Sequence, residues 1–409
     1  MLKYSFGTKV RMFPSSQQKK IIFKNSNASR FIYNNLIALN FEIYKLQKTL
    51  DKIYIDTLAT RLKDLKTRRR YYGSWVKLEY PWLKDKQIDS LTIAQSTQSY
   101  QAAWNSFRKV HRAGVPNFHK KSYEEKYQTS GQSNKLGMYT GTARLIDYTH
   151  IRLPKLGIVK INKLPKKVIN HANETNIGTV TIRKTASGKY FISMQLNSDI
   201  PFASSFDKTH QAVGIDLNLE NFYMDSNGNI VDNPRYYKNA MKHLSKAQRK
   251  LSHRYNRAKI EKRNIKSSSN YQKQRLLVAK LQERVANKRN NFIHNLTINL
   301  VKNQDLIVCE ELRSKNMMKN HALARSISDV GWRIFLSQLE YKSKLYDKTF
   351  ITVNPKNTTQ TCSTCGYLLI DNEKLTLRDR EWTCPHCNTH HVRDYNAAIN
   401  ILHKGIDNI

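Results

Sequence analysis

The chain has 409 residues, more than one hydrophobic core usually serves, so about two to four domains are expected. Its 70 Lys and Arg residues against 31 Asp and Glu give a formal net charge of +39, which points to a polyanionic partner and most directly to nucleic acid. No apolar run is long enough to span a membrane and the first residues lack the apolar core of a signal peptide, so we expect a cytosolic protein.

The first half of the chain combines short strands with a long helical region. YSFGTKVRMFP alternates polar and apolar residues as a strand does and ends at Pro14, after which residues 16–112 show helical spacing of apolar residues. From Ile151 to Leu196 strand patterns return, with a hairpin turn at Ser187-Gly188. We predict a small β-barrel interrupted by a helical domain, with the boundaries 1–14 and 130–200 for the barrel and 15–129 for the helical domain.

A polar segment, residues 201–211, is predicted to link this half to the next domain. AVGIDLNLENFYMDSNGNIV (212–231) then reads as a buried strand, a second strand and an Asn227-Gly228 turn. The first of these strands carries a single acid, Asp216. A buried acid is costly unless something compensates it, so Asp216 is a candidate functional residue.

The next segment, residues 235–289, is strongly basic. It holds 18 Lys and Arg residues against two acids, and Ser267-Ser268-Ser269-Asn270 is expected to separate two long helices within it. A solvated helix face rarely carries such an excess of positive charge, so we predict contact with nucleic acid. The candidate contact residues are Lys242, Lys246, Arg249, Lys250, Arg254 and Arg257.

A second acid ends a second strand of buried type. In DLIVCEEL (305–312), Leu306 to Cys309 form the strand and Glu310 closes it. Because Glu311 follows directly, one of the two acids should be exposed to solvent. Cys309 is interpreted as a small core residue rather than a reactive thiol.

Four of the five cysteines form two C-x2-C pairs, Cys362 with Cys365 and Cys384 with Cys387, at the spacing of a zinc ribbon. In a reducing cytosol, clustered cysteines are better explained as metal ligands than as disulfides. Four thiolates would close a tetrahedral, structural zinc site. One of three nearby histidines could replace a sulfur, although an all-cysteine shell is expected: His386, His390 and His391.

The third acid, Asp394, follows the second cysteine pair, where RDYNAAINILHK predicts a helix. It could simply stabilise the helix N-terminus. Alternatively, Asp216, Glu310 and Asp394 could converge at one end of a sheet. Such a cluster repels itself unless divalent cations bind, and carboxylate oxygens suit Mg²⁺ or Mn²⁺. Two such ions can hydrolyse a phosphodiester bond.

The motifs GIDL, IVCEEL and RDYNAAINI, around CSTCG and REWTCPHC, resemble the TnpB family of transposon-encoded, RNA-guided DNA endonucleases, relatives of the small type V CRISPR effectors. Similar segments cover most of the chain, among them VRMFPSSQQ, RFIYNNLI, LPKLGIVKI, RKTASGKYFISM and NKRNNFIHNLT. Two positions depart from the family pattern. Asn218 stands where a glycine is usual, and Val392 stands where an acid often occurs.

The resemblance implies an α/β multidomain protein with a RuvC nuclease domain of RNase H-like fold, in which Asp216, Glu310 and Asp394 are the catalytic, metal-binding triad. Arg380 matches a family arginine near the active site and could clamp a phosphate or be a solvated ribbon residue. The barrel would be a wedge domain and the helical domain a recognition domain. The implied boundaries are 212–358 and 391–409 for the nuclease domain and 359–390 for a zinc-ribbon domain that binds target nucleic acid.

The implied partners are a guide RNA derived from the transposon end and double-stranded target DNA, in a bacterial or archaeal cell and associated with its nucleoid. The expected activity is cleavage of guide-matched DNA next to a short flanking motif. The residues alone support only a metal-dependent nuclease with a basic surface. Two alternatives stay open: a small type V CRISPR effector, and a repressor or transposition accessory protein that binds DNA without cutting it.

Overall fold

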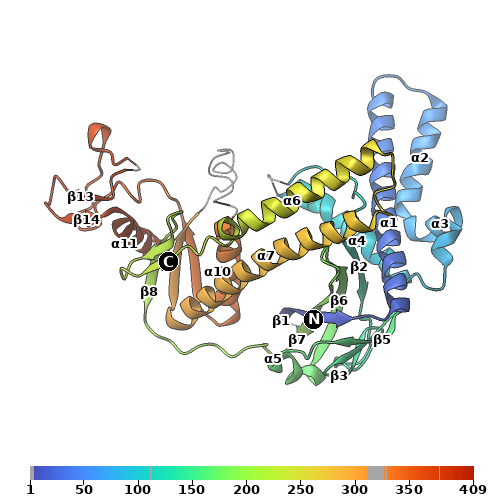
Figure 1. Ribbon diagram of the computed structural model, residues 1–409, viewed down its shortest axis with the longest axis horizontal. Coiled ribbons are helices and arrows are strands. Elements are labelled where there is room, and N and C mark those ends of the chain that lie inside the picture. The colour runs from blue at the N-terminus through green and yellow to red at the C-terminus, as the bar shows by residue number, and fades with distance from the viewer. Residues whose placement is uncertain (1–3, 111–112, 312–326, 328, 377) are drawn as a thin grey trace. The chain divides into compact units, whose positions relative to one another are not determined.

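The computed structural model describes residues 4–110, 113–311, 327, 329–376 and 378–409, and the chain forms two compact units, residues 1–202 and 203–409 (Figure 1). Each unit has apolar clusters of its own. None of the helices in the described ranges is both long and apolar enough to cross a membrane.

The first unit contains a seven-stranded antiparallel sheet in the order β2-β6-β7-β1-β5-β4-β3. One apolar core lies against it, and strands from both edges of the sheet contribute to this core, for example Tyr127 of β2 and Leu145 of β3. A sheet that shares one core between its two edges must curl. Its strands are β1 (Tyr4–Phe13), β2 (Glu125–Ser130), β3 (Arg144–Asp147), β4 (His150–Leu153), β5 (Gly157–Ile161), β6 (Thr175–Lys184) and β7 (Tyr190–Ser198).

The sheet resumes earlier in the chain than the sequence predicts, at residue 125 rather than residue 130. The sequence pattern places residues 125–129 in the helical domain, but Glu125–Ser130 form strand β2, which pairs with β6. Their alternation is visible in the structure, where Tyr127 and Thr129 are buried and their neighbours are more exposed. A strand of mostly polar residues at a sheet edge gives little apolar pattern to recognise.

Helices follow β1 directly. Ser15 starts α1 with a capping box, in which its hydroxyl accepts from the Gln18 amide and the Gln18 side chain accepts from the Ser15 amide. The apolar faces of these helices form a separate core around Ile32 and Leu36. The helical elements of this unit are α1 (Ser16–Leu50), α2 (Asp56–Arg70), α3 (Tyr72–Glu79), η1 (Pro81–Lys84), α4 (Ser90–Lys109), α5 (Lys166–Ile169) and η2 (Ala172–Glu174).

The second unit is built on a five-stranded mixed sheet in the order β10-β9-β8-β11-β12. β8, β11 and β12 run parallel to one another, whereas β9 and β10 are antiparallel additions. The parallel strands have apolar residues on both faces, as expected for a sheet covered on both sides. The strands are β8 (Ala212–Asp216), β9 (Asn221–Asp225), β10 (Ile230–Asp232), β11 (Leu306–Glu310) and β12 (Thr349–Val353).

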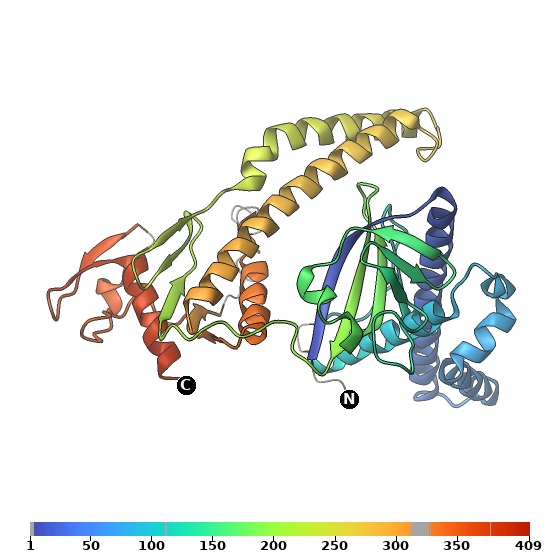
Figure 2. The same cartoon turned by 90° about the horizontal axis from the view of Figure 1, so that it is seen from below.

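Helices cover the two faces of this sheet. α7 (Ser269–Asn303) and α10 (Trp332–Leu345) bury one face, on which Ile215 and Cys309 lie, and α11 (Arg393–Ile406) covers the other (Figure 2). Between β12 and α11 the chain forms a small ribbon with the helical turn η3 (Asp371–Glu373) and the hairpin strands β13 (Glu381–Thr383) and β14 (His390–Val392).

α6 (Tyr236–Ile260) and α7 form a long antiparallel hairpin, which extends from the sheet of the second unit (Figure 2). The break between them falls at residues 261–268, so the predicted break at residues 267–270 overlaps it at Ser267 and Ser268, while Ser269 and Asn270 begin α7. Leu244, Ala247 and Val278 pack between the two helices, so most of the other α6 side chains remain exposed.

Candidate functional site

Two acids stand at adjacent strand ends in the second unit. β8 and β11 pair in parallel with Ile215 opposite Cys309, so the next residues in this register are Asp216 and Glu310. Both side chains therefore lie at the carboxyl ends of neighbouring parallel strands and point to the same face of the sheet. The register brings together two acids that are far apart in the sequence.

Helix α11 lies on that face because two glycines allow a close approach. A Cβ atom at Gly214 would lie 2.1 Å from the backbone oxygen of Ala398, and a Cβ atom at Gly405 would lie 2.3 Å from Cγ2 of Val308. Val308 and Gly214 are paired across β11 and β8. Asp216 and Glu310 are each two residues further along, so their side chains point toward the α11 side.

Asp394 occupies the first turn of α11 and is held by donors on both of its oxygens. The Arg393 guanidinium donates to Oδ1 at 3.1 Å from Nε, and Asn218 Nδ2 donates to Oδ2 at 3.2 Å. Asn218 is oriented in turn, because its Oδ1 accepts from the Asn221 amide at 2.8 Å. Val392, the residue before the helix, provides no side-chain cap, and Asp394 in the first turn is an acid at the end of the helix where negative charge is favourable.

Asp216 lies within electrostatic reach of Glu310 and Asp394, although among the described residues only the four cysteines bring potential metal ligands within 4.8 Å of one another. Burial raises the pKa of Asp216 well above its usual range, and the charges of Glu310 and Asp394 raise it further, whereas Arg393 lowers it. Burial also raises the pKa of Glu310, against the opposing effect of a hydrogen bond from Thr358 Oγ1 to Oε1 at 2.6 Å. Asp216 and Glu310 are buried acids whose ionised forms a divalent cation would stabilise.

Glu311 and Cys309, the neighbours of Glu310, have the exposed and buried positions that the sequence predicts. Glu311 is exposed, and Glu310 is the inward-facing member of the pair. Cys309 is fully buried on the opposite face, and burial strongly raises the pKa of its thiol. A protonated thiol in an apolar environment is unreactive, which agrees with a core role.

Arg380 is a residue of the ribbon that lies near one of the three acids, Asp394. Its Nη2 donates to Glu220 Oε2 at 2.7 Å, and its Nη1 lies 3.8 Å from Asp394 Oδ2. The side chain is half exposed, so it can also reach a bound phosphate. The structure therefore places it beside Asp394.

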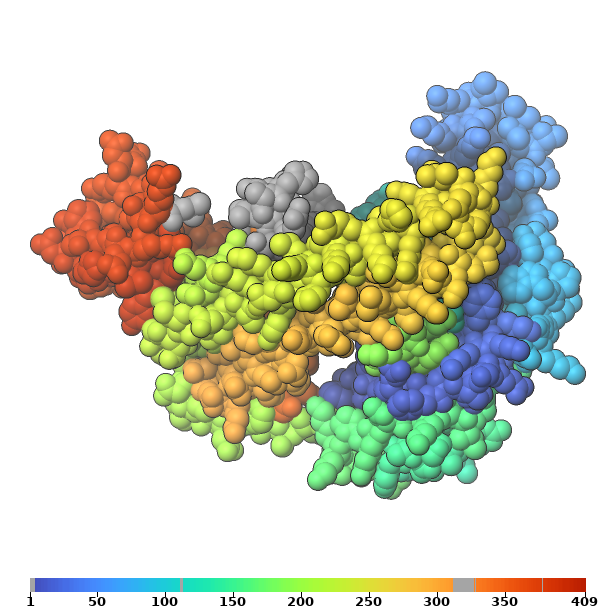
Figure 3. Space-filling model, in the orientation of Figure 1, coloured from blue at the N-terminus to red at the C-terminus, as the bar shows by residue number. Residues whose placement is uncertain are grey.

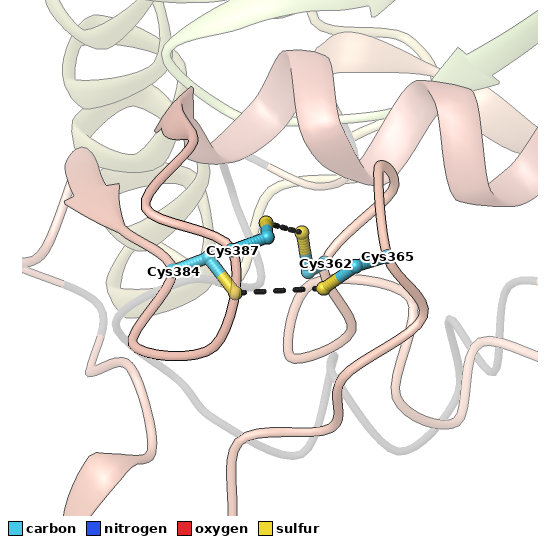
Figure 4. A group of neighbouring side chains, drawn as sticks. All are labelled: Cys362, Cys365, Cys384 and Cys387. Atoms are coloured by element: carbon cyan, nitrogen blue, oxygen red, sulfur yellow. Dashed lines mark hydrogen bonds between the residues drawn. The ribbon is translucent and has the colours of Figure 1, made fainter.

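The four cysteines meet in one cluster, with two knuckles of the chain facing each other (Figure 4). Their sulfurs all lie within 4.8 Å of one another, and the cross pairs Cys362–Cys387 and Cys365–Cys384 are 3.6 and 3.7 Å apart. A tetrahedral zinc ion with Zn–S bonds of about 2.3 Å separates its sulfurs by about 3.8 Å. The donor set and its spacing therefore fit zinc.

The three histidines have different surroundings. His386 stacks on Tyr367 and His390 is exposed, with its Nε2 at 3.5 Å from Glu381 Oε2. His391 is buried and its Nε2 lies 3.1 Å from Cys362 Sγ. Among the described residues, the metal-binding group consists of the four cysteines without a histidine.

The predicted nucleic-acid contacts all lie on α6, and side chains of α6 form an open ridge in Figure 3. Lys242, Lys246, Arg249 and Lys250 are exposed. The other two are engaged: Arg254 donates to the Asn270 carbonyl across the hairpin, and Arg257 pairs with Glu261 at 2.9 Å. A groove of about 710 Å³ between α6 and α7 is lined by Lys246 and Lys250, with an apolar floor.

Sequence reasoning missed two residues of the carboxylate site. Thr358 donates to Glu310, and Asn218, noted only as a departure from a pattern, donates to Asp394. No short motif contains both members of either pair. The departure from glycine at residue 218 was the one signal that could have indicated a polar contact there.

Three family models match the chain in order. Residues 1–49 match a "Helix-turn-helix domain" and residues 199–321 a "Probable transposase", both of the OrfB type of insertion sequence IS605, and residues 332–401 match a "Cas12f1-like, TNB domain". Residues 4–49 contain one strand and part of one long helix, so the described part of the first match does not have the architecture of its name.

Relatives cover nearly the whole chain. A "Putative RNA-guided DNA endonuclease" of Streptomyces pristinaespiralis is 28% identical over 97% of this chain and 89% of its own length. The "Putative RNA-guided DNA endonuclease InsQ" of Escherichia coli is 27% identical over 97% of this chain and 91% of its own length. Among solved structures, a Cas12f1–sgRNA–target DNA complex has a similar fold, with a TM-score of 0.52 and 15% identity over 97% of this chain and 98% of the matched one.

Proposed function

Because the chain belongs to the TnpB family of the OrfB type and is related to Cas12f, we propose that it is an RNA-guided DNA endonuclease that cleaves guide-matched DNA beside a short flanking motif. The observation that carries this proposal is the approach of three carboxylates, from β8, β11 and α11, at one end of the mixed sheet. The order β10-β9-β8-β11-β12 supports an RNase H-like nuclease domain of the RuvC type.

Asp216, Glu310 and Asp394 would hold two Mg²⁺ or Mn²⁺ ions, which would activate a water molecule and stabilise the leaving oxygen of a phosphodiester. The chain's own contacts prepare these ligands. Thr358 fixes one oxygen of Glu310, and Arg393 and Asn218 fix Asp394. Arg380 is close enough to this cluster to orient a phosphate of the strand to be cut.

The remaining parts of the chain fit the binding of nucleic acid. The four exposed cations of α6, Lys242, Lys246, Arg249 and Lys250, would contact the phosphates of a guide RNA. The four-cysteine ribbon would hold a structural zinc ion and contact target nucleic acid, and the curled sheet and helices of the first unit would act as wedge and recognition domains. In this scheme base pairing reads the target sequence, and the protein reads only the flanking motif.

Two alternative functions each differ from the proposed one in a single respect. A small type V CRISPR effector would have the same chemistry but take its guide from a repeat array. A repressor or transposition accessory protein would bind the same DNA without cutting it. The three acids and their hydrogen bonds favour cleavage over binding alone, because a protein that only binds has no need for a buried carboxylate cluster.

The proposal is tested by identifying the RNA first. RNA that copurifies with the protein is sequenced, and a duplex matching its variable end is offered with and without Mg²⁺. We expect cleavage of the matched duplex only when Mg²⁺ is present. A matched duplex that is bound but stays intact under all conditions would support the non-cleaving alternative. The absence of copurifying RNA would contradict the proposal that an RNA guides the protein.

A further inference from the structure

We propose that His391 is a positioning residue that donates a hydrogen bond to the Cys362 thiolate of the zinc site and so couples the metal cluster to the first turn of α11. The link from α11 to cleavage rests on the proposed function. The hydrogen bond and its effect on zinc do not, since they concern only the ribbon.

The distance between the two side chains distinguishes a hydrogen bond from shared coordination. Two ligands of one tetrahedral zinc ion, a sulfur at about 2.3 Å and a nitrogen at about 2.05 Å, would be about 3.6 Å apart. His391 Nε2 lies 3.1 Å from Cys362 Sγ, which is shorter and suits direct hydrogen bonding. A metal-bound thiolate has no proton to donate, so the imidazole must be the donor.

The surroundings of Cys362 explain why it needs such a donor. Four thiolates around one zinc ion leave two excess negative charges, and Cys362 is only 1% exposed, so water cannot compensate its share. Cys387 has its own partner, the Thr389 hydroxyl at 3.2 Å. His391 is the comparable partner for Cys362, and its buried ring is held in place against Trp382, with 4.8 Å between the ring centres.

The chain connects this contact directly to Asp394. Strand β14 ends at Val392 and α11 begins at Arg393, so no loop separates His391 from the helix. The Arg393 amide also donates to the Arg380 carbonyl at 2.8 Å, which continues the β13–β14 pairing up to the helix start. Fixing the His391 ring on the zinc cluster therefore fixes the backbone that leads into the turn carrying Asp394.

The test compares two adjacent histidines in the full chain. His391→Ala removes the donor and His391→Gln keeps a side-chain N–H, whereas His390→Ala changes a residue on the opposite, exposed side of β14. Three quantities are measured: the rate at which zinc passes to a chromophoric chelator, the thiolate-to-metal charge-transfer band after replacement of zinc by Co²⁺, and hydrogen exchange at residues 393–396. None of them requires cleavage.

For His391→Ala we expect zinc to be lost about tenfold faster, a shifted charge-transfer band and faster exchange in the first turn of α11. His391→Gln should restore part of each, and His390→Ala should match the wild type. Equal behaviour of His391→Ala and His390→Ala would overturn the proposal. So would a Co²⁺ spectrum of the wild type that shows three sulfurs and one nitrogen, because His391 would then be a ligand. A protein that passes these tests but cuts no DNA would contradict only the proposed function.

Discussion

Asp216, Glu310 and Asp394 differ in how far the described residues around them compensate their charge. Asp394 receives donors on both oxygens, from Arg393 and Asn218. Glu310 receives one, from Thr358. The side chain of Asp216 lies deepest and accepts no hydrogen bond from the residues that the structure describes, so the least compensated carboxylate of the site is at the end of the central strand β8.

This difference predicts that Asp216 destabilises the protein when no divalent cation is present. Burial raises its pKa in the folded state above the value in the unfolded chain, about 3.9, so any stability from the protonated form is present in acid and is lost as the pH rises through the folded pKa. Asp216→Asn should therefore raise the free energy of unfolding near neutral pH without added Mg²⁺. The gain should shrink in acid.

Thermal unfolding with and without Mg²⁺ checks this prediction. Added Mg²⁺ should stabilise the wild type and have little effect on Asp216→Asn, because the variant lacks the charge that the ion would compensate. If Asp216→Asn were less stable than the wild type near neutral pH without Mg²⁺, a group of the chain itself would have to compensate Asp216.

Thr358 offers a prediction about pH. Its hydroxyl lowers the pKa of Glu310 by donating to the carboxylate, so Thr358→Val should raise that pKa. The ascending limb of the cleavage-rate profile should then move to higher pH, with a rate about tenfold lower near neutrality. Thr358→Ser keeps the hydroxyl and should retain the wild-type profile. An unchanged profile in Thr358→Val would show that Glu310 is not the group that limits the rate.

The three acids could be found in the sequence because each breaks a local pattern. Asp216 interrupts an apolar strand, Glu310 ends one, and Asp394 follows a cysteine motif. Thr358 and Asn218 could not be found in this way. They are polar residues in loops, and their contacts join positions 48 and 176 residues apart, which only the fold brings together.

At the scale of elements, asparagine side chains attach the ribbon to α11. Asn396 accepts from the Ser363 amide and donates to the Thr361 carbonyl, both at 2.8 Å, and it is fully buried. Asn400 donates to the carbonyls of Thr358 and Thr361. The helix that carries Asp394 therefore holds the start of the ribbon by side-chain hydrogen bonds as well as by the chain itself.

Loss of the Asn396 contacts should loosen this attachment. Asn396→Ala would leave the Ser363 amide without its partner, while the Thr361 carbonyl would keep only the hydrogen bond from Asn400, so the free energy of unfolding should fall by about 1 kcal/mol. Asn408→Ala, which removes an exposed contact of the same helix, should have little effect. Denaturant unfolding of the zinc-loaded protein measures both. Equal stability of the two variants would show that the ribbon is held by other contacts.

Elements whose pattern lies within one segment could be predicted, whereas a strand defined by a distant partner could not. The α6–α7 hairpin was predictable because helical spacing and a serine-rich break lie within one segment. The polar strand β2 was assigned to the helical domain, since its partner β6 lies some 50 residues further along the chain and its own pattern is weak.

At the scale of the whole molecule, a net charge of +39 predicts binding to RNA that weakens steeply with salt. Each phosphate contact makes the fall of log affinity with log salt steeper by about 0.7 to 0.9, so the contribution of the exposed α6 cations to this slope can be counted. Changing Lys242, Lys246, Arg249 and Lys250 to Gln should lower that slope by about three.

Arg257 provides the control, because it already pairs with Glu261, an acid that Arg263 also contacts. Arg257→Gln should change the slope by much less than one contact. Titrations of the full chain with its copurifying RNA at several salt concentrations give these slopes. A fourfold variant with the slope of the wild type would exclude α6 as part of the RNA-binding surface.

The central claim is that the carboxylate cluster cuts a strand which the rest of the protein only binds. The direct measurement compares Glu310→Gln with Glu311→Gln, two adjacent acids of which the first faces α11 and the second is exposed. Each variant is loaded with guide RNA and assayed for binding and for cleavage of the same matched duplex with Mg²⁺. We predict normal binding by both, with cleavage nearly abolished only in Glu310→Gln. Full cleavage by Glu310→Gln would contradict the assignment of the active site.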